Sequence, residues 1–124
     1  MRDVIRKQTM VVTTDAAGAA TAYSAPVAGR LVQIRYVKTD YANGVDFNIT
    51  DSESGATLWA QNDVNASVTV MPRGATHTTA GVAALYAAAG TAVQDMIPVA
   101  ELVKIVIASG GNATSGTFYI YYED

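Results

Sequence analysis

Two stretches near the C-terminal end decide the fold, namely Leu102-Val103-Lys104-Ile105-Val106-Ile107-Ala108 and Thr117-Phe118-Tyr119-Ile120-Tyr121-Tyr122. Both consist largely of β-branched and aromatic residues, which favour strands over helices. The segment Ser109-Gly110-Gly111-Asn112 between them has the small and polar residues typical of a loop. The pattern predicts two antiparallel strands joined as a long hairpin.

Upstream, apolar and polar residues alternate with a period of two in several short runs, which predicts half-buried strands. Turn-forming residues at 15–18, 40–44 and 51–55 predict hairpins between neighbouring runs. Proline has no amide hydrogen to donate to a ladder, so Pro72 is expected to end the run over 66–71. The clearest apolar faces are those of residues 30–38 and 45–50, made by Val32, Ile34 and Tyr36 and by Val45, Phe47 and Ile49.

These runs add up to about eight strands with no alternation of strands and helices, so the fold class is all-β. We expect a single-domain antiparallel β-sandwich over residues 9–124, preceded by an N-terminal arm over residues 1–8. The arm is either a frayed end or a segment that becomes ordered on a partner. A jelly roll is the preferred topology, although an immunoglobulin-like sandwich shares this pattern. The alanine-rich residues 82–89 predict one short helical turn or an ordered loop.

Composition excludes several classes of protein. Charged residues make up 15% of the 124 residues and hydrophobic ones 50%, against about 25% charged in an average soluble domain. A net charge of −3 leaves no basic excess for phosphates, so a nucleic-acid partner is not expected. No apolar run approaches the ~20 residues that span a bilayer, and the first residues lack a signal-peptide pattern. We therefore expect synthesis in the cytoplasm and no membrane partner.

The chain also lacks a recognisable constellation for catalysis. The only histidine is His77 and there is no cysteine, which disfavours a zinc site. The Gly-x-Ser-x-Gly motif of serine hydrolases is missing. A group of acidic residues in the first half of the chain fails the glycine spacing of a calcium loop; these are Asp40, Asp46, Asp51 and Glu53. The sequence predicts no catalytic residues, no bound metal and no cofactor, and hence a protein that is not an enzyme.

The seven tyrosines suggest a role in contacts with other molecules, because tyrosines whose hydroxyl group stays in contact with water are common at interfaces. A tyrosine-lined sheet surface in a monomer is the alternative interpretation. Trp59 is expected in the core, since Leu58 and Trp59 should point to opposite faces of one strand. The residues that we expect to contact a partner are Arg2, Arg6, Lys7, Arg73, His77, Tyr86, Tyr119, Tyr121 and Tyr122, the last three as outward tyrosines of the final strand.

A family resemblance comes from the order of several short phrases in the chain. These are Gly29-Arg30-Leu31, Ile34-Arg35-Tyr36, Gly44-Val45-Asp46-Phe47, Leu58-Trp59, Pro72-Arg73, Leu85-Tyr86, Val103-Lys104-Ile105-Val106-Ile107-Ala108-Ser109-Gly110-Gly111 and Gly116-Thr117-Phe118. This layout resembles small structural proteins of tailed bacteriophages, and most of all the capsid decoration, or cement, proteins with a jelly-roll fold.

The resemblance implies a virion protein on the outside of the capsid that bridges major capsid subunits of the expanded head. It further implies a homodimer or homotrimer. Two other classes stay open. A phage tail or head-completion component would share the composition and the all-β fold. A carbohydrate-binding module would use aromatic side chains on a sheet face to stack on sugar rings.

Overall fold

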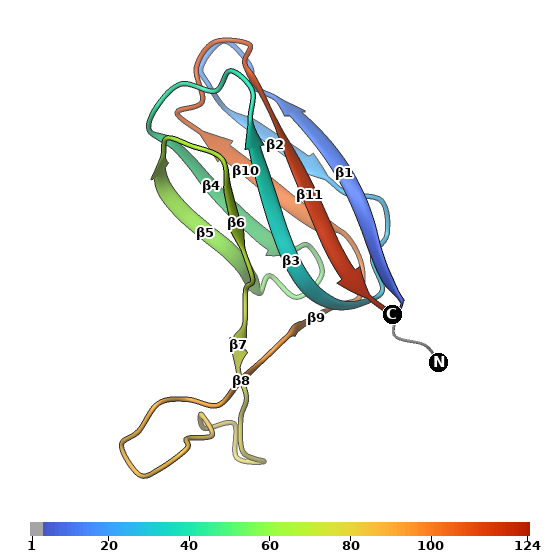
Figure 1. Cartoon of the computed structure of the whole chain (residues 1–124), viewed down its shortest axis with the longest axis vertical. Coiled ribbons are helices and arrows are strands. Elements are labelled where there is room, and N and C mark those ends of the chain that lie inside the picture. Colours follow the sequence, from blue (N-terminus) through green and yellow to red (C-terminus); the bar gives the residue numbers. More distant parts are fainter. Residues whose placement is uncertain (1–3) are drawn as a thin grey trace.

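The computed structural model describes residues 4–124, which form strands and no helix (Figure 1). The all-β prediction is therefore confirmed. Eleven strands occur within these residues. They are β1 (Ile5–Thr13), β2 (Ala20–Tyr23), β3 (Gly29–Lys38), β4 (Val45–Asp51), β5 (Thr57–Val64), β6 (Val68–Val70), β7 (Gly74–Ala75), β8 (Gln94–Asp95), β9 (Ile97–Val99), β10 (Val103–Ala108) and β11 (Ser115–Glu123).

Two antiparallel sheets face each other as a sandwich. The first sheet has the order β1-β11-β3-β6, with β9 also paired to β3. The second has the order β2-β10-β4-β5. Strands β7 and β8 pair only with each other, outside both sheets. The predicted β-sandwich is thus present, with β11 and β10 at the centres of the two sheets.

The core lies between the sheets and is built by the predicted alternation. Every second residue of β4 is buried, as is every second residue of β10 and of β11. Aromatic rings meet at the centre, where Phe47 makes edge contacts with Tyr36 at 4.7 Å and with Phe118 at 5.0 Å between ring centroids. Such contacts add to the stabilisation that burial of the rings already provides.

Two β-bulges alter the predicted faces. In β3, the register with β11 shifts by one residue between Tyr121 and Tyr122, so Leu31 is buried and Val32, predicted to face the core, is only half-buried. In β5, a shift opposite Ile49 lets both Leu58 and Trp59 face the core. Trp59 is buried as predicted, but the expected opposition of Leu58 and Trp59 is wrong, because an extra residue in one strand breaks the alternation.

Three of the four predicted hairpins are also wrong. Strands β4 and β5 do pair across residues 52–56. However, β1 and β2, β3 and β4, and β10 and β11 each lie in different sheets. The turns between them are corners that carry the chain across the sandwich. A turn sequence shows where the chain reverses, but the partner of each strand depends on packing distant in the sequence.

The N-terminal arm is shorter than predicted. Residues 5–8 belong to β1, where Ile5 pairs with Glu123 and Gln8 with Ile120. The side-chain amide of Gln8 also donates hydrogen bonds from Nε2 to the carbonyl oxygens of Ala25 and Pro26, both at 3.1 Å. The mixed charges in this stretch do not prevent pairing, because its side chains lie at an exposed edge of the sheet.

Candidate interaction surface

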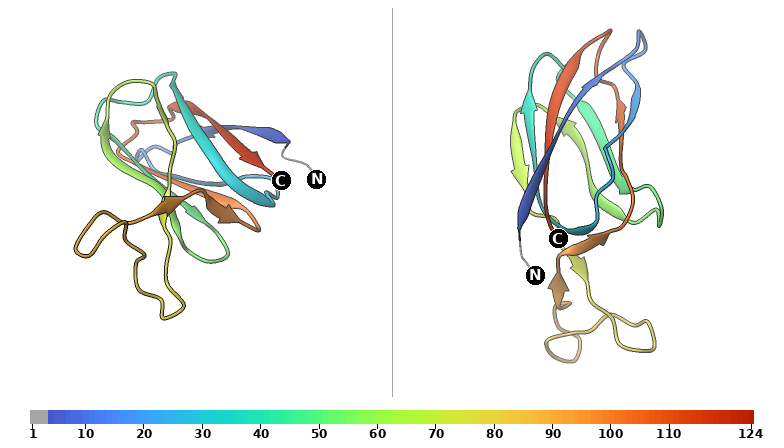
Figure 2. Two further views of the ribbon diagram at one scale, coloured as in Figure 1. Left: turned by 60° about the horizontal axis from the view of Figure 1, so that its bottom comes forward. Right: turned by 90° about the vertical axis from the view of Figure 1, so that its right-hand side faces the viewer.

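The chain between β6 and β9 leaves the sandwich and returns as one long extension, residues 71–96. It projects from the end of the sandwich where β11 ends (Figure 1), and two further views show it clear of both sheets (Figure 2). At the opposite end, the loops are bound to one another. Thr14 Oγ1 donates to the carbonyl of Gly111 at 2.6 Å, and the amide of Ala42 donates to Gly110 at 2.8 Å. One end of the molecule is therefore closed by hydrogen-bonded loops, and the other carries the extension.

The extension is an ordered loop, which is one of the two structures predicted for residues 82–89. Its tip folds as a small meander, in which isolated bridges pair His77 with Ala83 and Leu85 with Ala92. Gly81 and Gly90 close the two turns through amide hydrogen bonds to Thr78 at 2.9 Å and Ala87 at 2.8 Å. A helix does not form here despite the alanines, because a short helix is stable only when one face packs against a core, and nothing in this tip is buried.

The composition of the extension differs from that of the sandwich. No residue from 71 to 96 is buried, and residues 74–94 contain no Asp, Glu, Lys or Arg. Large apolar side chains are exposed along it, from Met71 through Val82 and Leu85 to Tyr86, which is 75% exposed. Interface cores are depleted in charged residues, and large exposed apolar patches mark interaction sites. The extension combines the depletion in charge with four large apolar side chains that are exposed one by one along it.

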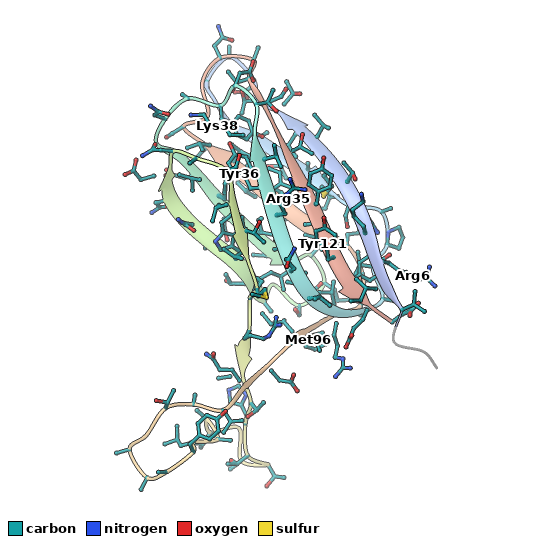
Figure 3. The ribbon with its side chains drawn as sticks, viewed as in Figure 1. Arg6, Arg35, Tyr36, Lys38, Met96 and Tyr121 are labelled. Carbon is teal, nitrogen blue, oxygen red and sulfur yellow. The ribbon has the colours of Figure 1, made fainter. Side chains whose placement is uncertain are left out.

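One side-chain hydrogen bond links the base of the extension to the sandwich, and two more lie within the base itself. Arg73 donates from Nη1 to the carbonyl oxygens of Val32 at 3.1 Å and Pro72 at 2.7 Å. Asp95 accepts a hydrogen bond from the amide of Met96 at 2.7 Å, and Met96 lies at the base of the extension (Figure 3). Arg73 therefore links the base of the extension to β3, the strand with which β6 and β9 on either side of the extension also pair.

Other exposed apolar side chains lie on the two edge strands β1 and β2, but on opposite outer faces of the sandwich. Ile5 and Val11 share the outer face of the first sheet with Lys7, whereas Tyr23, which is 53% exposed and follows the inward Ala22, lies on the outer face of the second sheet. Val4, just before β1, is also exposed. Together with the four side chains of the extension, these are all the large hydrophobic residues that are exposed within residues 4–124. Strand β1 pairs with β11 on one side and β2 with β10 on one side, so both strands have an open edge.

The outer face of the first sheet carries a different group of predicted contact residues. Tyr119 and Tyr121 are half-buried on this face of β11, and Tyr121 lies beside Arg35 in Figure 3. Lys7 on β1 and Arg35 on β3 each lie 5.3 Å from the ring centroid of Tyr119. The Tyr119 ring is therefore flanked by cations from both neighbouring strands, a favourable cation–π arrangement.

The predicted contact residues thus separate into two groups. Arg73, His77 and Tyr86 lie in the extension. Lys7, Tyr119 and Tyr121 share the outer face of the first sheet, and Arg6 lies at its end, paired with Asp124 at 2.7 Å. Arg2 lies outside the described residues.

Tyr122 does not belong to either group. It is 9% exposed and packs in the core, so its predicted outward position is wrong. The physical reason is the period of two in a strand, since a neighbour of the outward Tyr121 must point inward.

The acidic residues of the first half serve turns and strand ends. Asp51 is buried and accepts hydrogen bonds from the Glu53 amide and the Ser54 hydroxyl, both at 3.1 Å. Asp40 accepts from the Ser115 amide at 2.6 Å, and Asp46 from the Asp63 amide at 3.0 Å.

Across residues 4–124 there is no pocket and no group of three or more His, Asp or Glu side chains placed to hold a metal ion. In the same part of the chain, no helix is long and apolar enough to cross a membrane.

Sequence reasoning missed Val82, Leu85, Tyr23 and Arg35 as surface residues of interest. For the extension a signal was available, because a run as long as 74–94 without one charged residue is unusual in a chain with charges spread elsewhere. For Tyr23 and Val11 no such signal exists, since an edge strand reads like any other strand.

Comparison with models of known protein families gives no match, and comparison with curated proteins gives none either.

Proposed function

We propose that the chain is a non-enzymatic structural protein of a tailed-bacteriophage virion, and that it acts as a decoration protein on the outside of the expanded head. In this role it binds where neighbouring major capsid subunits meet. Each bound copy favours the assembled shell by mass action, and many copies on one shell add avidity.

The observation that carries the assembly role is the extension, which is ordered, has no buried residue and is free of charged side chains from residue 74 to 94. A monomer gains nothing from keeping such a surface in water, whereas an assembly that buries it gains the free energy of apolar burial. The phage part of the proposal rests on the resemblance of the sequence layout to decoration proteins.

The strand order supports the jelly roll as the finer description of the sandwich. When β7, β8 and β9 are set aside, each corner between β1 and β2, β3 and β4, and β10 and β11 moves the chain from one sheet to the other. Only β4 and β5 are sequential neighbours that pair within one sheet. Such repeated crossing between two four-stranded layers is the pattern of a double Greek key, and jelly rolls are common in viral capsids.

The carbohydrate-binding alternative receives less support. A sugar platform on the outer face of the first sheet needs the open face of an aromatic ring there, but Lys7 and Arg35 both lie over the Tyr119 ring at 5.3 Å. A tail or head-completion component remains the alternative that the experiment must separate from a decoration protein.

The test is co-sedimentation of the purified protein with undecorated, expanded heads of the phage that encodes it. Unexpanded proheads and isolated tails are the controls. We expect saturable binding to expanded heads alone, together with greater resistance of the decorated heads to heat. Binding to tails would move the protein to the tail, and binding to none of the three particles would refute the proposal.

A further inference from the structure

Strand β1 leaves one side of its backbone unpaired over nine residues. Among the strands at the sheet edges within residues 4–124 it is the longest, and its register with β11 runs without a shift. The edge strand β5 has two register shifts, and Asp63 near its end has a φ of 57°. The other edge strands β2, β6 and β9 have four residues or fewer. A long, regular edge is a template for another strand, and β1 is the edge that has this form.

The hydrogen bonds at the two ends of β1 show which backbone groups face the open edge. The Thr14 amide donates to the Thr114 carbonyl at 2.8 Å, and the Asp124 amide donates to the Val4 carbonyl at 3.3 Å. Residues of an antiparallel strand that bond to one neighbour alternate with residues that do not. The even-numbered residues of β1 therefore bond to β11, and the odd-numbered ones turn their N–H and C=O groups to the open edge. These are Ile5, Lys7, Thr9, Val11 and Thr13, all of them exposed.

We propose that β1 pairs antiparallel with β1 of a second copy, about a two-fold axis at Thr9. Thr9 then lies opposite Thr9, Lys7 opposite Val11, and Ile5 opposite Thr13, so all five odd-numbered residues bond across the contact. The same surface is used on both molecules, so the contact is isologous and closes as a dimer. This inference goes beyond the proposed function, because it names the contact that joins two copies whether or not they bind a head.

The side chains of β1 argue for a second copy as the occupant, because the strand is complementary to itself when it is reversed. Directly opposed threonines are a favourable cross-strand pair. Val11, which is 66% exposed in a single copy, lies beside the methylene groups of Lys7 from the other copy. No like charges stand opposite each other, whereas a register centred on Lys7 would oppose the two ammonium groups. Charge therefore selects this register from its neighbours.

The surroundings of β1 leave room for the partner strand. Figure 1 shows β1 as the outermost strand of the first sheet, and the extension projects from the end of the sandwich in Figures 1 and 2. The linker between β2 and β3 approaches from the inner side, where Gln8 bonds to Ala25 and Pro26. The Lys7 ammonium lies 5.3 Å from the ring centroid of Tyr119 on β11. The charge that often protects an edge strand therefore leans away from this edge.

The experiment measures the solution mass of the full-length protein and its variants by sedimentation equilibrium over a range of concentrations. Val11→Lys and Val11→Glu form a matched pair, because each removes the same exposed valine and neither should disturb the core. Thr9→Pro removes an N–H that faces the open edge and leaves the bonds to β11 intact, which an edge strand tolerates. Thr9→Val, which keeps that N–H, is its control.

We expect the wild-type chain to form a dimer of the 13.0 kDa chain. Val11→Lys should dimerise at least about tenfold more weakly than Val11→Glu, because Lys7 of the second copy lies opposite this position twice in each dimer. Net charge alone predicts the reverse order. Adding a lysine to a chain of net charge −3 lowers the repulsion between copies, and adding a glutamate raises it.

Thr9→Pro should stay monomeric where the wild type and Thr9→Val are dimers, because the central hydrogen bonds of the contact are lost. Urea unfolding of each variant shows that it is folded. If Thr9→Pro does not fold, the two Val11 variants still decide the question.

The inference is overturned if the wild-type chain stays monomeric up to about 1 mM or forms trimers. It is also overturned if Val11→Lys associates as tightly as Val11→Glu, or if folded Thr9→Pro dimerises as the wild type does. Head binding is measured separately. A monomer that binds heads overturns this inference alone, whereas a dimer that binds no phage particle supports it and refutes the proposed function.

Discussion

Two stacked tyrosines in the core give a sharp test of the side-chain arrangement. Tyr36 and Tyr41 are both buried, with ring centroids 6.1 Å apart and an interplanar angle of 13°. The Tyr41 hydroxyl donates a hydrogen bond to the carbonyl oxygen of Val12. The Tyr36 hydroxyl is the only buried side-chain polar atom within residues 4–124 that lacks a partner. The same substitution, tyrosine to phenylalanine, should therefore have opposite effects at the two positions.

The magnitudes follow from what each hydroxyl does. Tyr41→Phe removes a hydrogen bond and leaves the Val12 carbonyl without that donor, which should cost about 1–2 kcal/mol. Tyr36→Phe removes a buried hydroxyl that makes no hydrogen bond, and burying such a group costs about 1–3 kcal/mol. Tyr36→Phe should therefore raise the free energy of unfolding or leave it unchanged. The two variants should differ by about 1 kcal/mol or more.

The assay is urea unfolding of the wild-type chain and both variants, with the midpoint and slope fitted for each. Because both rings keep their packing with Phe47, the slope should not change between variants. If Tyr36→Phe is as destabilising as Tyr41→Phe, the Tyr36 hydroxyl has a hydrogen-bond partner and the described arrangement of this part of the core is wrong.

Three further predictions concern the same core and the extension. Burial raises the pKa of Tyr36 to about 12 and also raises that of Tyr41. The folded state therefore favours the protonated tyrosines, and its full stability is present below pH 10. From there towards pH 12 the free energy of unfolding should fall by about 1.4 kcal/mol per pH unit for each tyrosine. When the free energy of unfolding is measured against pH, it should fall less steeply for Tyr36→Phe than for the wild type. Gly116→Ala would place a Cβ 2.8 Å from Tyr41 Cδ2 and 2.9 Å from Tyr36 Cε1, so it should cost about 3 kcal/mol or more in urea unfolding. Gly55→Ala, with nothing within 4 Å but a φ of +78°, should cost only about 1 kcal/mol. The third change replaces residues 76–93 by an Asn-Gly turn that joins the cross-strand partners Ala75 and Gln94. It should alter the free energy of unfolding of the monomer, measured by thermal unfolding, by less than about 1 kcal/mol. A large loss would mean that the extension is part of the folded core.

The sequence was a good guide to local structure and a poor one to strand pairing. Alternation in residues 45–50 predicted the buried face of β4 correctly, because that strand is buried on one face along its whole length. The same reasoning failed at Val32, where a bulge shifts the faces by one residue. It also failed at the loop from 109 to 114, which reads as a hairpin but crosses between the sheets. Sequence periodicity reports neither the extra residue of a bulge nor the sheet in which the next strand pairs.

The residues of the candidate surfaces were likewise predicted only in part. Tyr86, His77 and Arg73 were predicted as contact residues, and the fold brings them into one extension. The period of two in β11 already implies that Tyr121 and Tyr122 face opposite sides, so the error at Tyr122 was avoidable. The exposure of Val11 and of Tyr23 was not predictable, because each depends on its strand lying at the open edge of its sheet.

The central claim is that residues 71–96 form an interface and contribute little to the sandwich itself. Hydrogen exchange of the backbone amides, measured in dilute protein and again in the assembled protein, tests this most directly. We expect fast exchange of the extension in the dilute protein and strong protection of it after assembly, with β10 and β11 protected equally in both states. Equal exchange of residues 71–96 in the two states would contradict the claim.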